Sequence, residues 1–378
     1  MGERRGTIEP PAAVQAGGKH APPRRAHRPL IGVLVAVALL VGVFLVVVRP
    51  FGGGGGHPVR PHTTAPSRWR EAPLDAQGRP LRPFLDRSWW NSPVPANAPL
   101  DPDGTQVLDY LSSAPESGHG CLRLAGAQQN KWGQPAYWAH PGDPEYDVRG
   151  LPDGAPPEMR HLRIPTGARS ADNSDGTMTV YDVRRGYVAL LTDAHYRPAT
   201  NTWSASGGTV TFLDSNGLLA ATGRSDDPRN VGTHRGNNGA TSYVRFDMVQ
   251  DGDVRNVLKI ASGPELSDRF VFPMTGSDGD VTDPSVGAPP EGLRLRIKPS
   301  VDLKSLGLHP QALVIAEALQ RYGLYLGDSG GTTALKLEDT KAEGRGQLWT
   351  VTAEDLCTLP FTPQYWDVLQ EGYDPSAH

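Results

Sequence analysis

Between residues 178 and 351, short runs of alternating apolar and polar side chains are separated by Gly, Pro, Asn and Asp. Alternation with a period of two is typical of half-buried antiparallel strands, and the residues between the runs are typical of turns. The pattern predicts strands at residues 178–183, 187–192, 208–213, 242–248, 254–261, 269–273, 293–298, 324–326, 333–337 and 347–351.

Helical periodicity is scarce along the same part of the chain. Residues 310–322 begin with a proline suited to a first helical turn, carry an apolar face that includes Ile315 and Leu319, and precede Gly323 as a cap. A shorter helix is expected at 102–111. Many short strands with one or two helices favour a mainly β fold, an antiparallel β-sandwich of jelly-roll type, with a pair of closed barrels as the alternative.

The longest apolar run lies near the N-terminus, where residues 30–48 read LIGVLVAVALLVGVFLVVV without a charged side chain. Nineteen such residues are enough to span a bilayer. Six basic and two acidic residues precede the run, so the positive-inside rule leaves the N-terminus in the cytoplasm. A cleaved signal peptide is the alternative, but the run is longer than a usual signal and lacks a cleavage site directly after it.

These patterns predict a single-pass protein of the cell membrane in four parts. They are a basic cytoplasmic tail at 1–29, a transmembrane helix at 30–48 in contact with the lipid bilayer, a Gly/Pro-rich spacer at 49–76, and an extracellular β-domain at 77–378. The spacer is assigned from its composition, because it has almost no apolar periodicity.

Charge and cysteine content narrow the classes of partner and compartment. Beyond the tail remain 31 of the 37 basic and 39 of the 41 acidic residues, a net charge of −8 that does not favour nucleic acid. Cys121 and Cys357 both lie on the predicted oxidising side of the membrane, so we expect a disulfide between them, with two buried free thiols as the alternative.

The stretch GDSGG at residues 327–331 raises the question of a nucleophilic serine. LLTDAHY contains His195 and RFDMV contains Asp247, and with Ser329 they follow the order and similar spacing of chymotrypsin-family serine proteases. This resemblance implies a triad of His195, Asp247 and Ser329. However, no Ile-Val-Gly-Gly-like N-terminus precedes His195, and short apolar runs flank the glycines. These features favour a hairpin turn between Leu326 and Ala334.

A second resemblance covers more of the chain. The segments RSWWNSPVP (87–95), TWSASGGTV (202–210), APPEGLRLRIKPSVDL (288–303) and ALQRYGLYLGDSGG (318–331) are similar to a group of uncharacterised, exported or membrane-anchored actinobacterial proteins. The resemblance implies one continuous domain and a surface location, and it implies no activity.

By analogy with other extracellular jelly rolls, we expect a protein that binds or cleaves glycan of the cell envelope or environment, or else a non-catalytic scaffold that binds other proteins. Tryptophans that could stack on sugar rings are Trp89, Trp90, Trp132, Trp138 and Trp203. Among them Trp138 and Trp203 are the binding candidates.

Candidate acid–base residues follow several predicted strands. Asp182, Asp193 and Asp247 could serve a glycoside hydrolase, and His234 with Arg235 in the loop GTHRGNNG could serve a polysaccharide lyase. Each of them also fits a solvated loop held by an ion pair.

Metal and cofactor motifs are sparse. ADNSDG (171–176) and SDGDVTD (277–283) gather oxygen atoms of the kind that calcium prefers, but neither has the spacing of an EF-hand loop. No cofactor is therefore predicted, and calcium stays the alternative.

Overall fold

The computed structural model describes residues 70–375, apart from 114–119, 129, 234 and 264. They belong to one compact unit, His62–His378. The predicted cytoplasmic tail, the apolar segment 30–48 and most of the spacer lie outside the described residues. Among the helices that the structure does describe, none has the length and apolar character needed to cross a membrane.

The folded domain begins earlier than the sequence predicted. Arg70 donates two hydrogen bonds of 2.7 Å to the carboxylate of Asp143, and Asp75 accepts one of 3.0 Å from Arg255. Residues 70–76 therefore belong to the domain, and the predicted start at residue 77 is too late. A segment without apolar periodicity can still be fixed by ion pairs, and composition does not reveal these.

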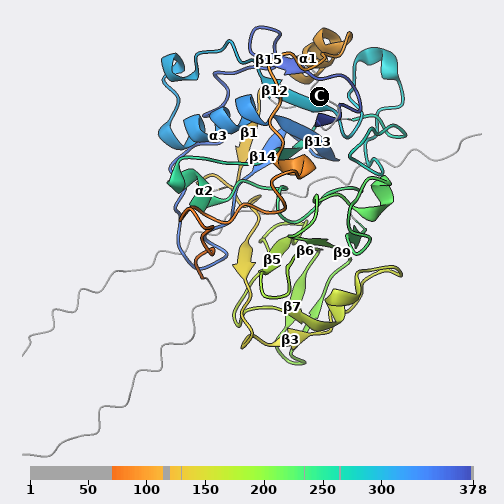
Figure 1. The fold of residues 1–378 in the computed structure, drawn as a ribbon, viewed down its shortest axis with the longest axis vertical. Helices are drawn as coiled ribbons and strands as arrows, with labels where there is room; N and C mark the ends of the chain where they lie inside the picture. The colour runs from red at the N-terminus through yellow and green to blue at the C-terminus, as the bar shows by residue number, and fades with distance from the viewer. Residues whose placement is uncertain (1–69, 114–119, 129, 234, 264, 376–378) are drawn as a thin grey trace, which may run out of the picture. The chain divides into compact units, whose positions relative to one another are not determined.

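In the residues that the structure describes, the strands form two larger sheets and two small ribbons. Figure 1 shows how these strands and the helices are arranged. The six-stranded sheet has the order β1 (Arg123–Ala125), β14 (Ala334–Lys336), β11 (Leu258–Ser262), β13 (Leu324–Ser329), β12 (Arg294–Ile297) and β15 (Trp366–Val368). The five-stranded sheet has the order β10 (Val231–Gly232), β9 (Gly207–Phe212), β6 (Tyr187–Thr192), β5 (Met178–Asp182) and β2 (Ala136–Trp138). The ribbons pair β3 (Glu145–Tyr146) with β4 (Leu162–Arg163), and β7 (His195–Arg197) with β8 (Thr202–Ser204).

The mainly β class is confirmed, but both larger sheets are mixed. The strand pairs β1–β14, β11–β13 and β2–β5 run parallel, while the other neighbours run antiparallel. The expected antiparallel jelly roll is therefore wrong in its strand pairing. Apolar alternation along one strand does not show the direction of its neighbour, because that direction depends on the connection between them.

The described part of the chain forms three α-helices: α1 (Gly104–Ser113), α2 (Phe246–Asp251) and α3 (Pro310–Arg321). Helix α3 confirms the prediction for 310–322, and α1 lies close to the shorter predicted helix. Helix α2 replaces part of the strand expected at 242–248, and the strands expected at 269–273 and 347–351 do not form. Short 3-10 helices lie at η1 (Trp89–Asn91), η3 (Pro157–His161), η4 (Ala220–Thr222), η5 (Pro284–Val286) and η6 (Leu303–Leu306).

Apolar side chains gather in three main clusters. One joins α1 and α3 to the six-stranded sheet, and a second packs on the five-stranded sheet. The third is rich in aromatic residues and draws on both sheets through Trp138, Tyr181 and Tyr325, and it also includes Trp90. The indole N–H of Trp90 also donates a 2.8 Å hydrogen bond to the carbonyl of Gly217. The two sheets therefore share part of their core.

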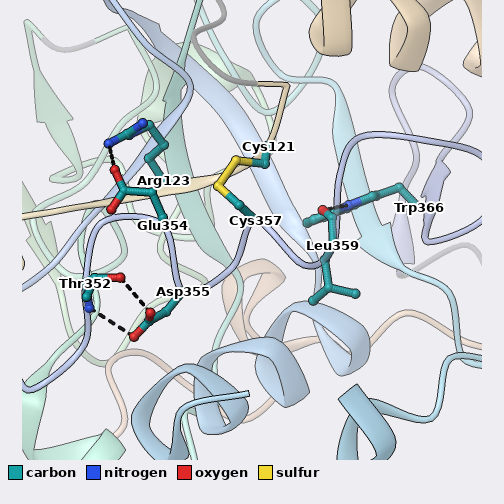
Figure 2. Close-up of a disulfide and its surroundings, with 8 residues drawn as sticks. All are labelled: Cys121, Arg123, Thr352, Glu354, Asp355, Cys357, Leu359 and Trp366. Atoms are coloured by element: carbon teal, nitrogen blue, oxygen red, sulfur yellow. Dashed lines mark hydrogen bonds and ion pairs between the residues drawn. A yellow bond between two sulfur atoms is a disulfide. The ribbon is translucent and has the colours of Figure 1, made fainter. Parts of the chain in front are cut away.

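A disulfide joins two distant parts of the sequence, as expected (Figure 2). Cys121 precedes strand β1 and Cys357 precedes β15, and their Cα atoms lie 5.0 Å apart across 236 positions. An ion pair between Arg123 and Glu354 lies close to the bridge. The disulfide thus fixes the edge strand β1 to the C-terminal segment.

Candidate functional site

The GDSGG stretch lies where the chain leaves strand β13. Strand β13 ends at Ser329, and the chain then crosses the end of β11 to reach β14 on its other side. The predicted hairpin between Leu326 and Ala334 is therefore wrong, because β13 and β14 do not pair with each other. The pairing register shifts between Ile260 and Ser262, so β13 contains one extra residue, as in a β-bulge.

The side chains of the predicted protease triad are held by other partners. Ser329 donates its hydroxyl to the carbonyl of Asp278 at 3.2 Å. The exposed His195 ring lies 2.7 Å from Asp193, and Asp247 accepts a 3.0 Å hydrogen bond from Arg245. The hydrogen bonds of the described residues join none of the three to another, so the geometry does not favour the protease alternative.

Three carboxylates, which we call the carboxylate cluster, meet beside the bulge: Glu265, Asp278 and Glu291. One oxygen from each lies within 4.8 Å of the others. Glu265 follows β11, Glu291 precedes β12, and Asp278 lies in the loop between them. Glu265 and Glu291 are fully buried, whereas Asp278 is exposed.

Two cations lie on one side of this cluster. The guanidinium of Arg235 is 2.7 Å from Asp278 and 3.1 Å from Asp328, and its Nε is 3.8 Å from Glu291. The buried Lys259 is 3.2 Å from Asp328. The sequence suggested Arg235 and His234 as candidate lyase residues. Arg235 lies among carboxylates, and His234 lies outside the described residues.

Burial is the main cause of the raised pKa values of the two buried carboxyls, Glu265 and Glu291. Burial, together with the charge of Glu291, holds the pKa of Glu265 well above its ordinary value. Burial, with a further contribution from Asp278, raises the pKa of Glu291 to about 7. One oxygen of Glu265 accepts a 2.7 Å hydrogen bond from the Ser262 hydroxyl. One oxygen of Glu291 accepts a 2.8 Å hydrogen bond from the Asp278 amide. The cluster can therefore hold protons or a cation.

Next to the cluster is a pocket of about 430 Å³, which we call the crossover pocket. Asp328 and Ser329 belong to its wall, so it adjoins the carboxylate cluster. Its rim includes Trp132, whose side chain is 39% exposed. The remaining lining residues are Arg123, Leu124, Ala125, Asn130, Asp175, Ala261, Gly330, Gly331, Thr332, Ala334, Lys336 and Ala353.

The carboxylates chosen from the sequence do not share a groove of their own. Asp182 is fully buried at the turn between β5 and β6, where it accepts hydrogen bonds from the Arg185 amide at 3.0 Å and from Arg163 at 3.3 Å. Asp193 pairs with His195, and Asp247 lies in the first turn of α2. Hydrogen bonds and ion pairs give each of them a local structural role.

The two tryptophans chosen as sugar-binding candidates belong to the core. Trp138 is 7% exposed and stacks on Tyr181 with ring centroids 4.2 Å apart. Trp203 is 3% exposed and packs against Tyr196. Both rings are packed against other aromatic side chains, so their burial does not favour the assignment of these two residues to sugar binding.

The buried members of the cluster left little trace in the sequence. Glu265 and Glu291 are single charges in different loops, and the nearby Lys259 is a single charge in strand β11. Only the acidic segment 277–283, which contains Asp278, gave a signal. A further signal that could have been used is Lys259, a charged residue within the apolar strand β11. Such a residue indicates a buried ion pair, because lysine is almost never buried without a partner.

Comparison with protein-family models, with curated proteins and with solved structures finds no match for this chain. The two resemblances seen in the sequence therefore stay predictions. Evidence for a function comes from the geometry and charge of the crossover pocket and the carboxylate cluster.

Proposed function

We propose that the chain binds a glycan in the crossover pocket, and that the segment 30–48 anchors it at the cell surface. The observation that carries the proposal is the exposed ring of Trp132 in a pocket whose mixed wall also holds polar side chains such as Asn130 and Lys336. An indole offers a flat apolar face to a sugar ring, while polar side chains and backbone groups can bond its hydroxyls.

The loop that carries Trp132 is held in place by its own hydrogen bonds. The side-chain oxygen of Asn130 accepts the Trp132 amide at 2.8 Å and the Gly126 amide at 3.2 Å. The amide of Asn173 donates a 3.0 Å hydrogen bond to the carbonyl of Lys131. A rim fixed before the ligand arrives loses less conformational entropy on binding, which favours recognition.

The charges of the pocket favour binding over hydrolysis. Asp175 forms a 2.8 Å ion pair with Lys336, and Asp328 lies between Lys259 and Arg235. A glycosidase needs one protonated carboxyl and one carboxylate that face the scissile bond. Both pocket carboxylates are instead neutralised by cations, so we assign them to the positioning of hydroxyl groups.

A second depression of about 490 Å³ is a weaker candidate. It is lined by residues of a single segment, 147–160, and none of its lining residues is aromatic. The crossover pocket draws its walls from several strands and loops, which is typical of a ligand site.

The proposal is tested with the purified full-length chain and its Trp132→Ala variant. Retention on a set of insoluble polysaccharides and on peptidoglycan identifies a ligand, and calorimetry with its soluble oligosaccharide gives the Kd. We expect the Trp132→Ala variant to bind at least about tenfold more weakly, because loss of an aromatic contact with a ligand often has that effect.

The matched control is Tyr196→Ala, which removes another exposed aromatic ring that does not line the pocket. This variant should bind as the unmodified chain does. Equal affinity of the Trp132→Ala variant, or no retention of the unmodified chain on any glycan tested, contradicts the proposal.

A further inference from the structure

We propose that Glu265, Asp278 and Glu291 form a binding site for one divalent cation, with calcium as the ion. This inference is independent of glycan binding. Calcium bonds to carboxylate oxygens at about 2.3–2.6 Å, so two ligands of one ion can lie up to about 5 Å apart. The three oxygens of the cluster meet that limit, since they lie within 4.8 Å of one another.

The two glutamates each present an oxygen without a partner, which is a separate indication of a ligand. Both side chains are 0% exposed, and neither Oε2 atom has a hydrogen-bond partner among the described residues. A buried carboxylate oxygen without a partner is costly, because it has lost its water and gained nothing in return. A cation bonded to both oxygens would remove that cost.

The charges around the cluster also match a divalent ion. The described side chains that meet here carry four carboxylates, counting Asp328, and only two cations, Arg235 and Lys259. Both cations contact Asp328, and Arg235 is shared with Asp278 and, at 3.8 Å, with Glu291. The ion pairs of the described residues do not include Glu265. With all four carboxyls ionised, as binding of a cation to them requires, the excess of two negative charges equals the charge of one calcium ion.

The backbone around the cluster is closely packed and holds the three segments together. Gly279 follows Asp278 and Gly292 follows Glu291, and a Cβ atom at these glycines would overlap the carbonyl oxygens of Glu265 and Val271 respectively. Only glycine permits so close an approach. The Val281 amide donates to the Glu265 carbonyl at 3.0 Å, and the Val271 amide donates to the Glu291 carbonyl at 2.7 Å.

The proposed ion would also act on the crossover pocket through Asp278. The Asp278 carboxylate accepts the Ser329 amide at 2.9 Å, and its carbonyl accepts the Ser329 hydroxyl at 3.2 Å. Ser329 belongs to the pocket wall. A cation that fixes Asp278 would therefore fix that part of the wall as well.

The test uses the full-length chain after treatment with EDTA and dialysis. Calorimetry with calcium chloride should show one bound ion, and millimolar calcium should raise the Tm by several degrees. Glu265→Gln and Glu291→Gln should each weaken calcium binding at least about tenfold. In the absence of calcium these variants should be as stable as the EDTA-treated chain or more stable, because each replaces a buried carboxyl, whose ionisation burial disfavours, with a neutral amide.

Asp280→Asn is the matched control, since Asp280 is exposed in the same acidic loop and is not part of the cluster. It should bind calcium as the unmodified chain does. The proposal is overturned if calcium addition gives neither a binding heat nor a rise in Tm. It is also overturned if both Gln variants bind calcium as the unmodified chain does. In either case the buried carboxyls hold protons and not the ion. Binding of magnesium without calcium overturns the choice of ion. These experiments add only the metal ion, so their outcome does not depend on whether the chain binds a glycan.

Discussion

Individual buried carboxyls also occur outside the carboxylate cluster, and Glu343 is the strongest example. Its carboxylate accepts a 2.8 Å hydrogen bond from the Ala136 amide and a 2.9 Å bond from Arg345. Arg345 is shared with Glu338 at 2.5 Å. Burial, followed by the charge of Glu338, holds the pKa of Glu343 well above its ordinary value of 4.5. One guanidinium thus serves two buried acids.

This arrangement predicts a pH-dependent stability. Because the pKa of Glu343 is raised on folding, protonation of this carboxyl favours the folded state. This stabilisation is complete below about pH 4.5 and is lost as the pH rises toward the folded-state pKa. The slope for one proton is at most about 1.4 kcal/mol per pH unit. We expect Glu343→Gln to flatten the fall in unfolding free energy above pH 4.5, measured by urea denaturation. The exposed Glu317→Gln is the control, and profiles that stay parallel for the Glu343 variant contradict the assignment.

Secondary-structure elements could be predicted from the sequence where their signals are local. Residues 187–192 form β6 at the predicted bounds, because a short apolar run between Gly186 and Asp193 is visible within the local sequence. Helix α3 likewise carries its own start signal and apolar face. The pairing of β13 with β11 could not be predicted, because it depends on the crossover around β11 and not on either strand alone. The carboxylate cluster was missed for the same reason, since loops bring together Glu265, Asp278 and Glu291.

Helix α3 allows a direct test of what its packing contributes. Leu319 is fully buried in the cluster that joins the helix to the six-stranded sheet. We expect Leu319→Ala to lower the unfolding free energy by about 2–5 kcal/mol, because the change leaves a cavity in a packed core. Glu317→Ala, on the exposed side of the same helix, should change it by no more than about 0.5 kcal/mol. Urea denaturation of both variants measures the difference, and equal values for the two would show that α3 is loosely packed.

At the scale of the whole molecule, distant segments are joined by buried cations and by one covalent bond. Arg294 in β12 donates to the Ser92 carbonyl at 2.9 Å, and Arg296 donates to the Pro95 carbonyl at 2.7 Å and to Asp367 in β15 at 3.1 Å. The segment near residue 92 is thereby attached to the six-stranded sheet. The disulfide does the same for β1 and the C-terminal part. Both connections span about 200 residues or more of the sequence, as their positions show.

The disulfide therefore predicts a large effect on global stability. Cys121 and Cys357 close a loop with a sequence separation of 236, and a crosslink over so long a loop restricts the unfolded chain strongly. We expect a Cys121→Ser, Cys357→Ser double variant to lose about 2–5 kcal/mol of unfolding free energy relative to the oxidised chain. Guanidinium denaturation with and without reductant measures this loss. The reductant should lower the stability of the unmodified chain and leave that of the double variant unchanged, because only the bridge responds to it. If instead both thiols of the native protein react with an alkylating agent before any reduction, the bridge is absent and the stability of the chain rests on its core and ion pairs alone.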